Sequence, residues 1–154
     1  MKLSEIIDVN NIMPDLRCTD KKGVLEELAN AVSNHEPSIE KGALVKVLVE
    51  RERLGTTGIG DGVAIPHGKM KGVSKPVISF GRCKDGVDFD SIDGQPAYLF
   101  CLLVAPENSS SVHLQVLAKI AKLLKSNALR KKLMEAKDRE EIYQTIIQSD
   151  EESL

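Results

Sequence analysis

The chain has 154 residues, a length typical of one domain with its own hydrophobic core. Of these residues 29% are charged, and the formal net charge is −2. The near-neutral charge and the absence of tryptophan argue against a nucleic-acid partner, because such proteins are usually basic and offer aromatic rings for base stacking. No apolar run approaches the roughly 20 residues of a membrane span, and the N-terminus lacks a signal-peptide core. We therefore expect a cytoplasmic protein without membrane insertion, forming a single domain over residues 1–154.

Apolar spacing divides the first third of the chain into a short helix, an extended segment and two longer helices. The expected ranges are 3–8 for the short helix, 12–18 for the extended segment or edge strand, and 20–33 and 39–51 for the longer helices. Pro14 interrupts the extended segment, as is common in edge strands, and Thr19 or Asp20 can cap the first long helix. The second long helix therefore ends near Arg51, where a glycine-rich segment begins.

The rest of the chain contains strands and turns and then becomes helical. Strands are expected over 77–82 and 97–104, turns at 85–86 and 93–94, and helices over 112–125, 128–136 and 138–148. The second strand is nearly all apolar, which is typical of a buried central strand. The residues of the first of these helices expected to face the core are Leu114, Leu117, Ile120, Ala121 and Leu124. An acidic tail over 150–154 is expected to fray. Helices, then strands, then helices predict an α/β protein with three layers, α/β/α.

The segment over residues 51–69 carries the first candidate site. Five glycines fall within residues 55–69, which predicts a loop with unusual backbone angles and close approaches. Pro66 stiffens the chain before His67, and Gly68 is expected to leave one side of the imidazole uncovered. A histidine on a stiff, open turn is a candidate reactive nitrogen; the alternative is a loop histidine bonded to nearby backbone.

Motifs for nucleotides, calcium and other metals do not fit the sequence. Met70 follows Gly68-Lys69 where a Walker A loop needs Ser or Thr, and the glycines over 58–62 lead into an extended segment instead of a helix. The acidic turn over 88–94 lacks the third acid of a calcium loop, and no cysteine or histidine pair has metal-ligand spacing. We expect no cofactor and no metal, and buried reduced thiols at Cys18, Cys83 and Cys101.

Two further histidines differ in their surroundings. His35 lies between two expected helices and is expected to be exposed. His113 lies at the start of an expected helix, where free backbone N–H groups favour an anion; the alternative is a half-buried helix histidine. Arg51 adds a planar guanidinium that suits phosphate oxygens. His113 and Arg51, together with His67 and the glycine-rich segment, suggest phosphoryl transfer to an imidazole nitrogen, in which catalysis is mainly positioning and electrostatic stabilisation.

These residues also carry a resemblance to a known family. Glu52, Ile59-Gly60, Val63-Ala64-Ile65 and Pro66-His67-Gly68 match a signature position by position. In this the sequence resembles the type-2 enzyme IIA domains of the bacterial phosphoenolpyruvate phosphotransferase system, the fructose/mannitol class. The likeness continues through residues 89–96 and 113–118 and covers nearly the whole chain. Residues 51–60 and the length look most like the nitrogen-regulatory subgroup.

The resemblance implies a mixed sheet between helix layers and a role for each site residue. His67 would be phosphorylated on Nε2, His113 would be the second active-site histidine, and Arg51 would approach the phosphoryl group. The donor would be a phosphorylated HPr-type carrier, and the phosphorylation state would regulate partner proteins. Two alternatives remain: a sugar-specific IIA that passes phosphate to a IIB component, and a regulatory binding module that phosphorylation switches. We expect Arg53 to be a solvated charge, and Lys69 and Lys71 to be candidates for docking an acidic partner surface.

Overall fold

The computed structural model describes residues 1–17 and 19–153, so Cys18, expected to be a buried thiol, lies outside the described residues. Its helical elements are the 3₁₀ turn η1 (Leu3–Glu5) and the helices α1 (Lys21–His35), α2 (Lys41–Arg53), α3 (Ser110–Leu124), α4 (Asn127–Glu135) and α5 (Arg139–Glu152). Its strands are β1 (Ile7–Met13), β2 (Gly58–Gly60), β3 (Val63–Ala64), β4 (His67–Met70), β5 (Val77–Val87) and β6 (Ala97–Pro106). None of these helices is both long and apolar enough to span a membrane.

The strands described here form one mixed sheet of six, in the order β1-β5-β6-β3-β2, with β4 also paired to β6. β5 and β6 are antiparallel, whereas β3 and β4 both run parallel to β6. β3 pairs with Leu99 and Phe100, and β4 begins opposite Leu103, so β3 and β4 are two pieces of one interrupted strand. The interruption is Ile65-Pro66, immediately before His67. Pairing of β4 with β6 therefore fixes the position of the His67 backbone in the sheet.

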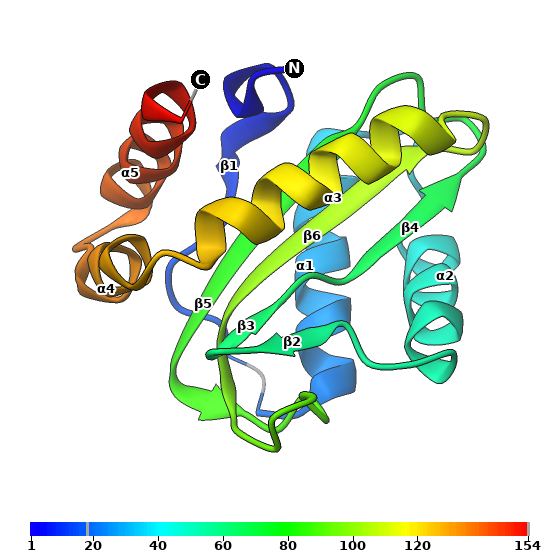
Figure 1. Ribbon diagram of the computed structural model, residues 1–154. Coiled ribbons are helices and arrows are strands. Elements are labelled where there is room, and N and C mark those ends of the chain that lie inside the picture. Colours follow the sequence, from blue (N-terminus) through cyan, green and yellow to red (C-terminus); the bar gives the residue numbers. More distant parts are fainter. Residues whose placement is uncertain (18, 154) are drawn as a thin grey trace.

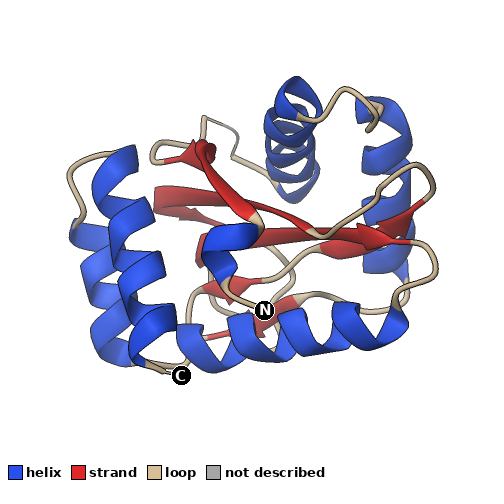
Figure 2. Cartoon of the chain, turned by 90° about the horizontal axis from the view of Figure 1, so that it is seen from above, coloured by secondary structure: helices blue, strands red, loops and turns tan. Residues whose placement is uncertain are grey.

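Helices cover both faces of the sheet, with α3 crossing one face and α1 and α2 covering the other (Figure 1). Figure 2 shows the same layers from above. The side chains of β6 contribute to both layers, because successive side chains of a strand point to opposite faces of the sheet. Leu99, Cys101 and Leu103 belong to the core under α3, α4 and α5, whereas Phe100 and Leu102 belong to the core under α1 and α2. The expected three-layer α/β/α fold and buried central strand are confirmed.

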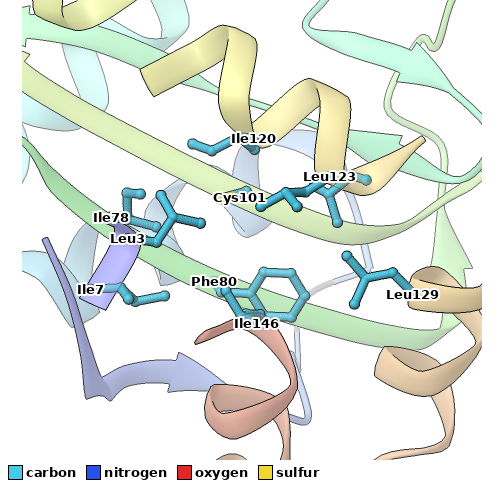
Figure 3. A pocket seen from close by; sticks show the side chains of 10 residues that line it. Leu3, Ile7, Ile78, Phe80, Cys101, Ile120, Leu123, Leu129 and Ile146 are labelled. Carbon is cyan, nitrogen blue, oxygen red and sulfur yellow. The ribbon is translucent and has the colours of Figure 1, made fainter. Parts of the chain in front are cut away.

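A small apolar cavity lies in the core beneath α3 (Figure 3). Side chains from both chain ends and from the sheet converge on it, among them Leu3, Phe80, Cys101 and Ile146. Its volume is about 20 Å³, roughly that needed by one water molecule, and its lining offers no polar partner for water. The cavity is therefore a packing defect of the core and is too small to hold a metabolite.

The N-terminal elements differ from the expected short helix over 3–8. Only the single turn η1 is helical, and strand β1 already begins at Ile7. Ile7 and Ile12 are buried against β5, so packing on the sheet overrides the local helical spacing. β1 lies at the sheet edge and ends at Met13, before Pro14, so of the described residues in the extended segment expected over 12–18 only the first two form a strand.

The sequence predicted a turn at residues 85–86, but these residues do not reverse the chain. β5 continues to Val87 through an irregularity in its pairing with β6 after Arg82, and Gly86 takes a positive φ of 82° there. Glycine at this position accommodates the irregularity without turning the strand back. The other expected turn is present, because the Gly94 N–H donates to the Ser91 carbonyl at 2.9 Å.

Two helical expectations were also wrong. Ile120 and Leu124 are buried, as expected, but Leu114 is 65% exposed. The buried position beside it is His113. A polar imidazole occupies a core-facing position, which apolar spacing alone misassigns. The tail does not fray before α5 ends at Glu152, because Asp150 is buried and accepts the Leu3 N–H at 2.7 Å.

Arg82 on β5 is a fully buried arginine that binds backbone carbonyls. Its Nη1 donates to the carbonyls of Leu133 and Ala136 at 2.8 and 2.7 Å, and its Nε donates to Pro14 at 2.9 Å. The two carbonyls at the end of α4 are those that a helix leaves unpaired, and they carry the negative end of the helix dipole. Arg82 therefore ties the last turn of α4 to the sheet.

We predict that Arg82→Met lowers the free energy of unfolding by about 3 kcal/mol, because it leaves several buried carbonyls without a donor. Urea denaturation of the purified protein measures this loss. Arg139→Met, at an exposed position on α5, is the matched control and should change the free energy by less than about 0.5 kcal/mol. Equal stability of the two variants would contradict the anchoring role of Arg82.

Candidate active site

The segment over residues 51–69 is more ordered than the expected loop. It contains the end of α2, the strands β2 and β3, and the start of β4. His67 is the first residue of β4 and is partly buried, so it does not lie on an open turn. Pairing of β4 with β6 at Leu103 holds its backbone, which is a firmer support than a glycine-rich loop provides.

Gly68 has a different role from the one expected. A Cβ atom at this position would clash with Cγ1 of Val47 on α2. Since side chains alternate along a strand, Gly68 faces α2 while His67 faces the α3 layer. Gly68 therefore allows α2 to pack closely on β4, and it does not uncover the imidazole.

The two ring nitrogens of His67 have different partners. Nδ1 lies 2.8 Å from the Ile65 carbonyl, which can only accept, so Nδ1 carries the proton. Nε2 lies 3.3 Å from Nε of Arg51, which can only donate, so Nε2 holds the lone pair. Arg51 is held in turn by its Nη1, which donates to the Gly55 carbonyl at 2.8 Å. The alternative interpretation, an unreactive loop histidine, predicts a bond to nearby backbone. Here that bond, from Nδ1 to the Ile65 carbonyl, leaves Nε2 as the nucleophilic nitrogen.

His113 lies against His67 from the first turn of α3. Their ring centroids are 5.3 Å apart, and His113 is 6% exposed. Its Nδ1 is buried without a hydrogen-bond partner in the part of the chain that the structure describes. The Ser109 hydroxyl donates to Pro106 instead of capping α3, so no N-cap side chain occupies the first N–H groups of the helix. Free N–H groups at a helix start favour an anion, so the anion site expected beside His113 stays a prediction.

Lys69 belongs to the same site, although the sequence suggested only partner docking for it. Its Nζ donates to the Ser110 hydroxyl at 2.9 Å, at the first residue of α3. Lys69 lies two residues after His67 on β4 and hence on the same face of the sheet. That two-residue spacing is the signal in the sequence that could have placed it there.

Burial and neighbouring charges keep both imidazoles neutral. Burial is the main cause that lowers the pKa of His67 below 6.5; the Ile65 carbonyl raises it, Arg51 lowers it and Glu52 raises it. Burial, followed by the charges of His67 and Lys69, lowers the pKa of His113 to about 4. Near neutral pH the lone pair on Nε2 of His67 is therefore available.

The other candidates of the sequence analysis lie outside this site. His35 is exposed, as expected, and its Nδ1 contacts the Ala31 carbonyl at 3.0 Å. Arg53 is a solvated charge paired with Glu50 at 2.8 Å. Cys83 and Cys101 are buried free thiols, and burial raises the pKa of Cys101 to about 12. Residues 1–17 and 19–153 contain no group of three or more histidine, cysteine or acidic side chains placed to hold a metal ion.

Comparison with known proteins places this geometry in a family. The family model of the phosphoenolpyruvate-dependent sugar phosphotransferase system, EIIA 2, matches residues 5–149. A nitrogen regulatory protein of Bradyrhizobium diazoefficiens is 40% identical over 146 residues, which are 95% of each chain. The fructose-specific EIIABC component of Bacillus subtilis is 36% identical over 97% of this chain, which spans only 24% of that protein.

The fold agrees with a solved member of the same group. The crystal structure of nitrogen regulatory protein IIA-Ntr from Neisseria meningitidis superimposes with a TM-score of 0.88 at 35% identity, over 94% of this chain and 98% of that one. The family model, the near full-length relatives and this structure agree with each other. The chain therefore belongs to the EIIA type-2 family of the phosphoenolpyruvate-dependent sugar phosphotransferase system.

Proposed function

We propose that the chain is a phosphocarrier that accepts a phosphoryl group on Nε2 of His67 from a phosphorylated HPr-type protein. The observation that carries this proposal is the tautomer of His67. The Ile65 carbonyl holds the proton on Nδ1, so the lone pair lies on Nε2, beside Arg51 and His113. A neutral, oriented imidazole is the nucleophile that phosphoryl transfer between histidines requires.

The transfer exchanges one phosphorus–nitrogen bond for another. Nε2 of His67 attacks phosphorus in line, the bond to the donor histidine breaks, and its electron pair returns to the donor ring. The attack makes the His67 ring cationic, and the Ile65 carbonyl stabilises that charge because it accepts the Nδ1–H. Donor and acceptor nitrogens are alike, so the transfer is nearly balanced and needs neither nucleotide nor metal.

In this proposal three groups stabilise the phosphoryl oxygens. The guanidinium of Arg51, which contacts Nε2 of His67, suits planar, paired recognition of such oxygens. His113 offers a buried ring nitrogen without a partner among the described residues, and Lys69 holds a positive charge at the start of α3. In phosphoryl transfer, positioning and charge stabilisation of this kind provide most of the catalysis.

The downstream role that we favour is regulatory. The 40% identity to a nitrogen regulatory protein covers 95% of both chains, and the structural match to IIA-Ntr is nearly complete. Phosphorylation adds roughly two negative charges to this surface and so changes which partner it tolerates. The chain is then a binding module switched by the phosphoryl group, with regulatory proteins as its targets.

A sugar-transport role is the second candidate, because the fructose-specific EIIABC component contains a region 36% identical to this chain. In that case phosphate passes from His67 to a IIB component. Incubation of the phosphorylated protein with fructose-type or mannitol-type IIB domains separates the two roles. Rapid loss of phosphate to a IIB domain favours transport, and retention of phosphate favours regulation.

We expect one acid-labile, base-stable phosphate on His67 after incubation with phosphoenolpyruvate, enzyme I and an HPr-type carrier. Mass spectrometry of peptides locates it. His67→Ala should carry no stable phosphate, whereas His35→Ala, at an exposed histidine, should be labelled like the parent protein. Stable label on His67→Ala would overturn the assignment.

Loss of either stabilising side chain should slow the transfer without abolishing it. We expect Arg51→Met and His113→Ala each to lower the initial rate about 100-fold, as for loss of one transition-state hydrogen bond. Arg53→Met, a solvated arginine two residues from Arg51, is the control and should transfer at the parent rate. Quench-flow measurement with phosphorylated carrier gives these rates, and a parent-like rate removes the residue concerned from the site.

The pH dependence follows from the lowered pKa values. The folded pKa of His67 lies below 6.5, so its ring is neutral at pH values above that folded pKa. Nε2 loses its lone pair to a proton only as the pH falls below the folded pKa. NMR titration should give a His67 midpoint below 6.5 and a His113 midpoint near 4. The transfer rate should be flat between about pH 7 and 8 and fall below the His67 midpoint. Titration of His67 above 6.5 would contradict this prediction.

A further inference from the structure

We propose that Glu52 and Thr57 are positioning residues for His67. By holding residues 55–57 against the end of α2, they keep the proton of His67 on Nδ1 and Arg51 in contact with Nε2. The inference deepens the proposed function, on which it rests for the role of Nε2. It concerns two residues that touch neither the reactive nitrogen nor a phosphoryl group.

The contact between Glu52 and Thr57 uses both carboxylate oxygens. Oε1 accepts the Thr57 N–H at 3.0 Å, and Oε2 accepts the Thr57 hydroxyl at 2.5 Å. The Glu52 side chain is 7% exposed and Thr57 is 3% exposed, so water does not compete for these bonds. Hydrogen bonds to a buried carboxylate are among the stronger ones in proteins, and two of them fix both position and orientation.

From Thr57, two further hydrogen bonds reach His67. The Thr57 carbonyl accepts the Ile65 N–H at 3.0 Å, and the Ile65 carbonyl accepts the Nδ1–H of His67 at 2.8 Å. Thr57 therefore holds the backbone of Ile65 through the peptide group that precedes it. The carbonyl of Ile65, in the peptide group that follows, is the acceptor that fixes the tautomer.

Arg51 closes the same network from the other side. It precedes Glu52 in α2 and donates to Nε2 of His67 at 3.3 Å and to the Gly55 carbonyl at 2.8 Å. Release of residues 55–57 from Glu52 would thus disturb the acceptor at Nδ1 and the donor at Nε2 together. Loss of these two contacts shifts the tautomer of His67. If Glu52 served only the stability of the fold, its loss would leave the tautomer unchanged.

The buried carboxylate is charge-compensated by α1. Nζ of Lys21 lies 3.0 Å from Oε1 of Glu52 and 4.7 Å from the centre of the Phe89 ring. Asp90, at 3.7 Å from the same Nζ, is largely exposed, so Glu52 is the buried partner of Lys21. Lys21 thus pairs with the same carboxylate that accepts two hydrogen bonds from Thr57.

A second anchor keeps this segment folded when the first is cut. The Thr56 hydroxyl donates to the Phe89 carbonyl at 2.9 Å and accepts the Gly58 N–H at 3.0 Å. The Ile92 N–H also donates to the Gly58 carbonyl at 3.0 Å. Loss of the Thr57 hydroxyl should therefore misplace the segment by a small amount and leave the fold intact.

Three substitutions and a matched control test the inference. Thr57→Val keeps the shape of the side chain and removes the hydroxyl bond, whereas Thr57→Ser keeps the hydroxyl. Glu52→Gln keeps the shape and removes one acceptor oxygen. The control is Glu50→Gln, the same chemical change on the same helix, at a side chain that is 57% exposed and paired only with Arg53 among the described residues.

The first measurement is the tautomer of His67 in the unphosphorylated protein, read from nitrogen-15 shifts and two-bond couplings of the imidazole at pH 8. We expect protonated Nδ1 in the parent, Thr57→Ser and Glu50→Gln proteins, and a mixture of tautomers in Thr57→Val and Glu52→Gln. The transfer rates should follow, with a loss of about 10-fold to 100-fold only in the last two variants. Unchanged tautomers and rates in both variants would overturn the inference.

The tautomer measurement uses no carrier protein, so the two proposals can fail separately. If the parent protein takes no phosphate but the tautomer shifts in Thr57→Val and Glu52→Gln, the phosphocarrier role fails and the positioning role stands. If the parent takes phosphate on His67 and the tautomer does not change in these variants, the positioning role fails. Circular dichroism of each variant checks that it has the same fold as the parent protein. If Thr57→Val does not fold, the tautomer of His67 in Glu52→Gln tests the positioning role.

Discussion

The hydrogen bond between Nδ1 of His67 and the Ile65 carbonyl is the contact on which the proposed chemistry depends. A histidine has two nitrogens of similar basicity, and only a fixed partner on one of them makes the other a defined nucleophile. The partner here is a backbone carbonyl two residues away, which the chain can orient only because Ile65-Pro66 interrupts the strand between β3 and β4. Both pieces remain paired with β6, so the sheet holds the backbone on each side of the interruption.

The same interruption brings the two helix layers together at one site. His67 faces the α3 layer and meets His113, whereas Arg51 reaches it from α2, which packs on the opposite face through Gly68. A positive guanidinium, a buried neutral imidazole and the start of α3 thus surround one nitrogen lone pair. Burial that lowers the pKa of both histidines serves this arrangement, because a protonated His67 could not attack phosphorus.

Sequence reasoning predicted the layers, which the structure confirms, and it named Arg51, His67 and His113, which the structure brings together. It did not predict the details that orient these side chains. The unbroken apolar run from Leu99 to Val104 identifies β6 because both faces of that strand are buried. Apolar periodicity identifies the helices because one face of each helix is buried. The same periodicity failed at Leu114, because the core-facing position beside it belongs to His113, and at β1, where pairing with β5 overrides local preference. Gly68 was misread for a similar reason: its purpose is visible only once Val47 of α2 lies against it. Lys69 and the Glu52–Thr57 contact depend on strand alternation and on a distance between separate segments, which spacing along the chain does not report.

In the proposed transfer Nε2 of His67 is the phosphoryl acceptor, and NMR spectroscopy tests this directly. The protein, labelled with nitrogen-15 in its histidines and phosphorylated by a phosphorylated HPr-type carrier, should show a one-bond phosphorus–nitrogen coupling to Nε2 of His67. The Nδ1 signal should retain its proton, because the Ile65 carbonyl still accepts it. A coupling to Nδ1 of His67, or to either nitrogen of His113, would contradict the central claim that the backbone selects the reactive nitrogen.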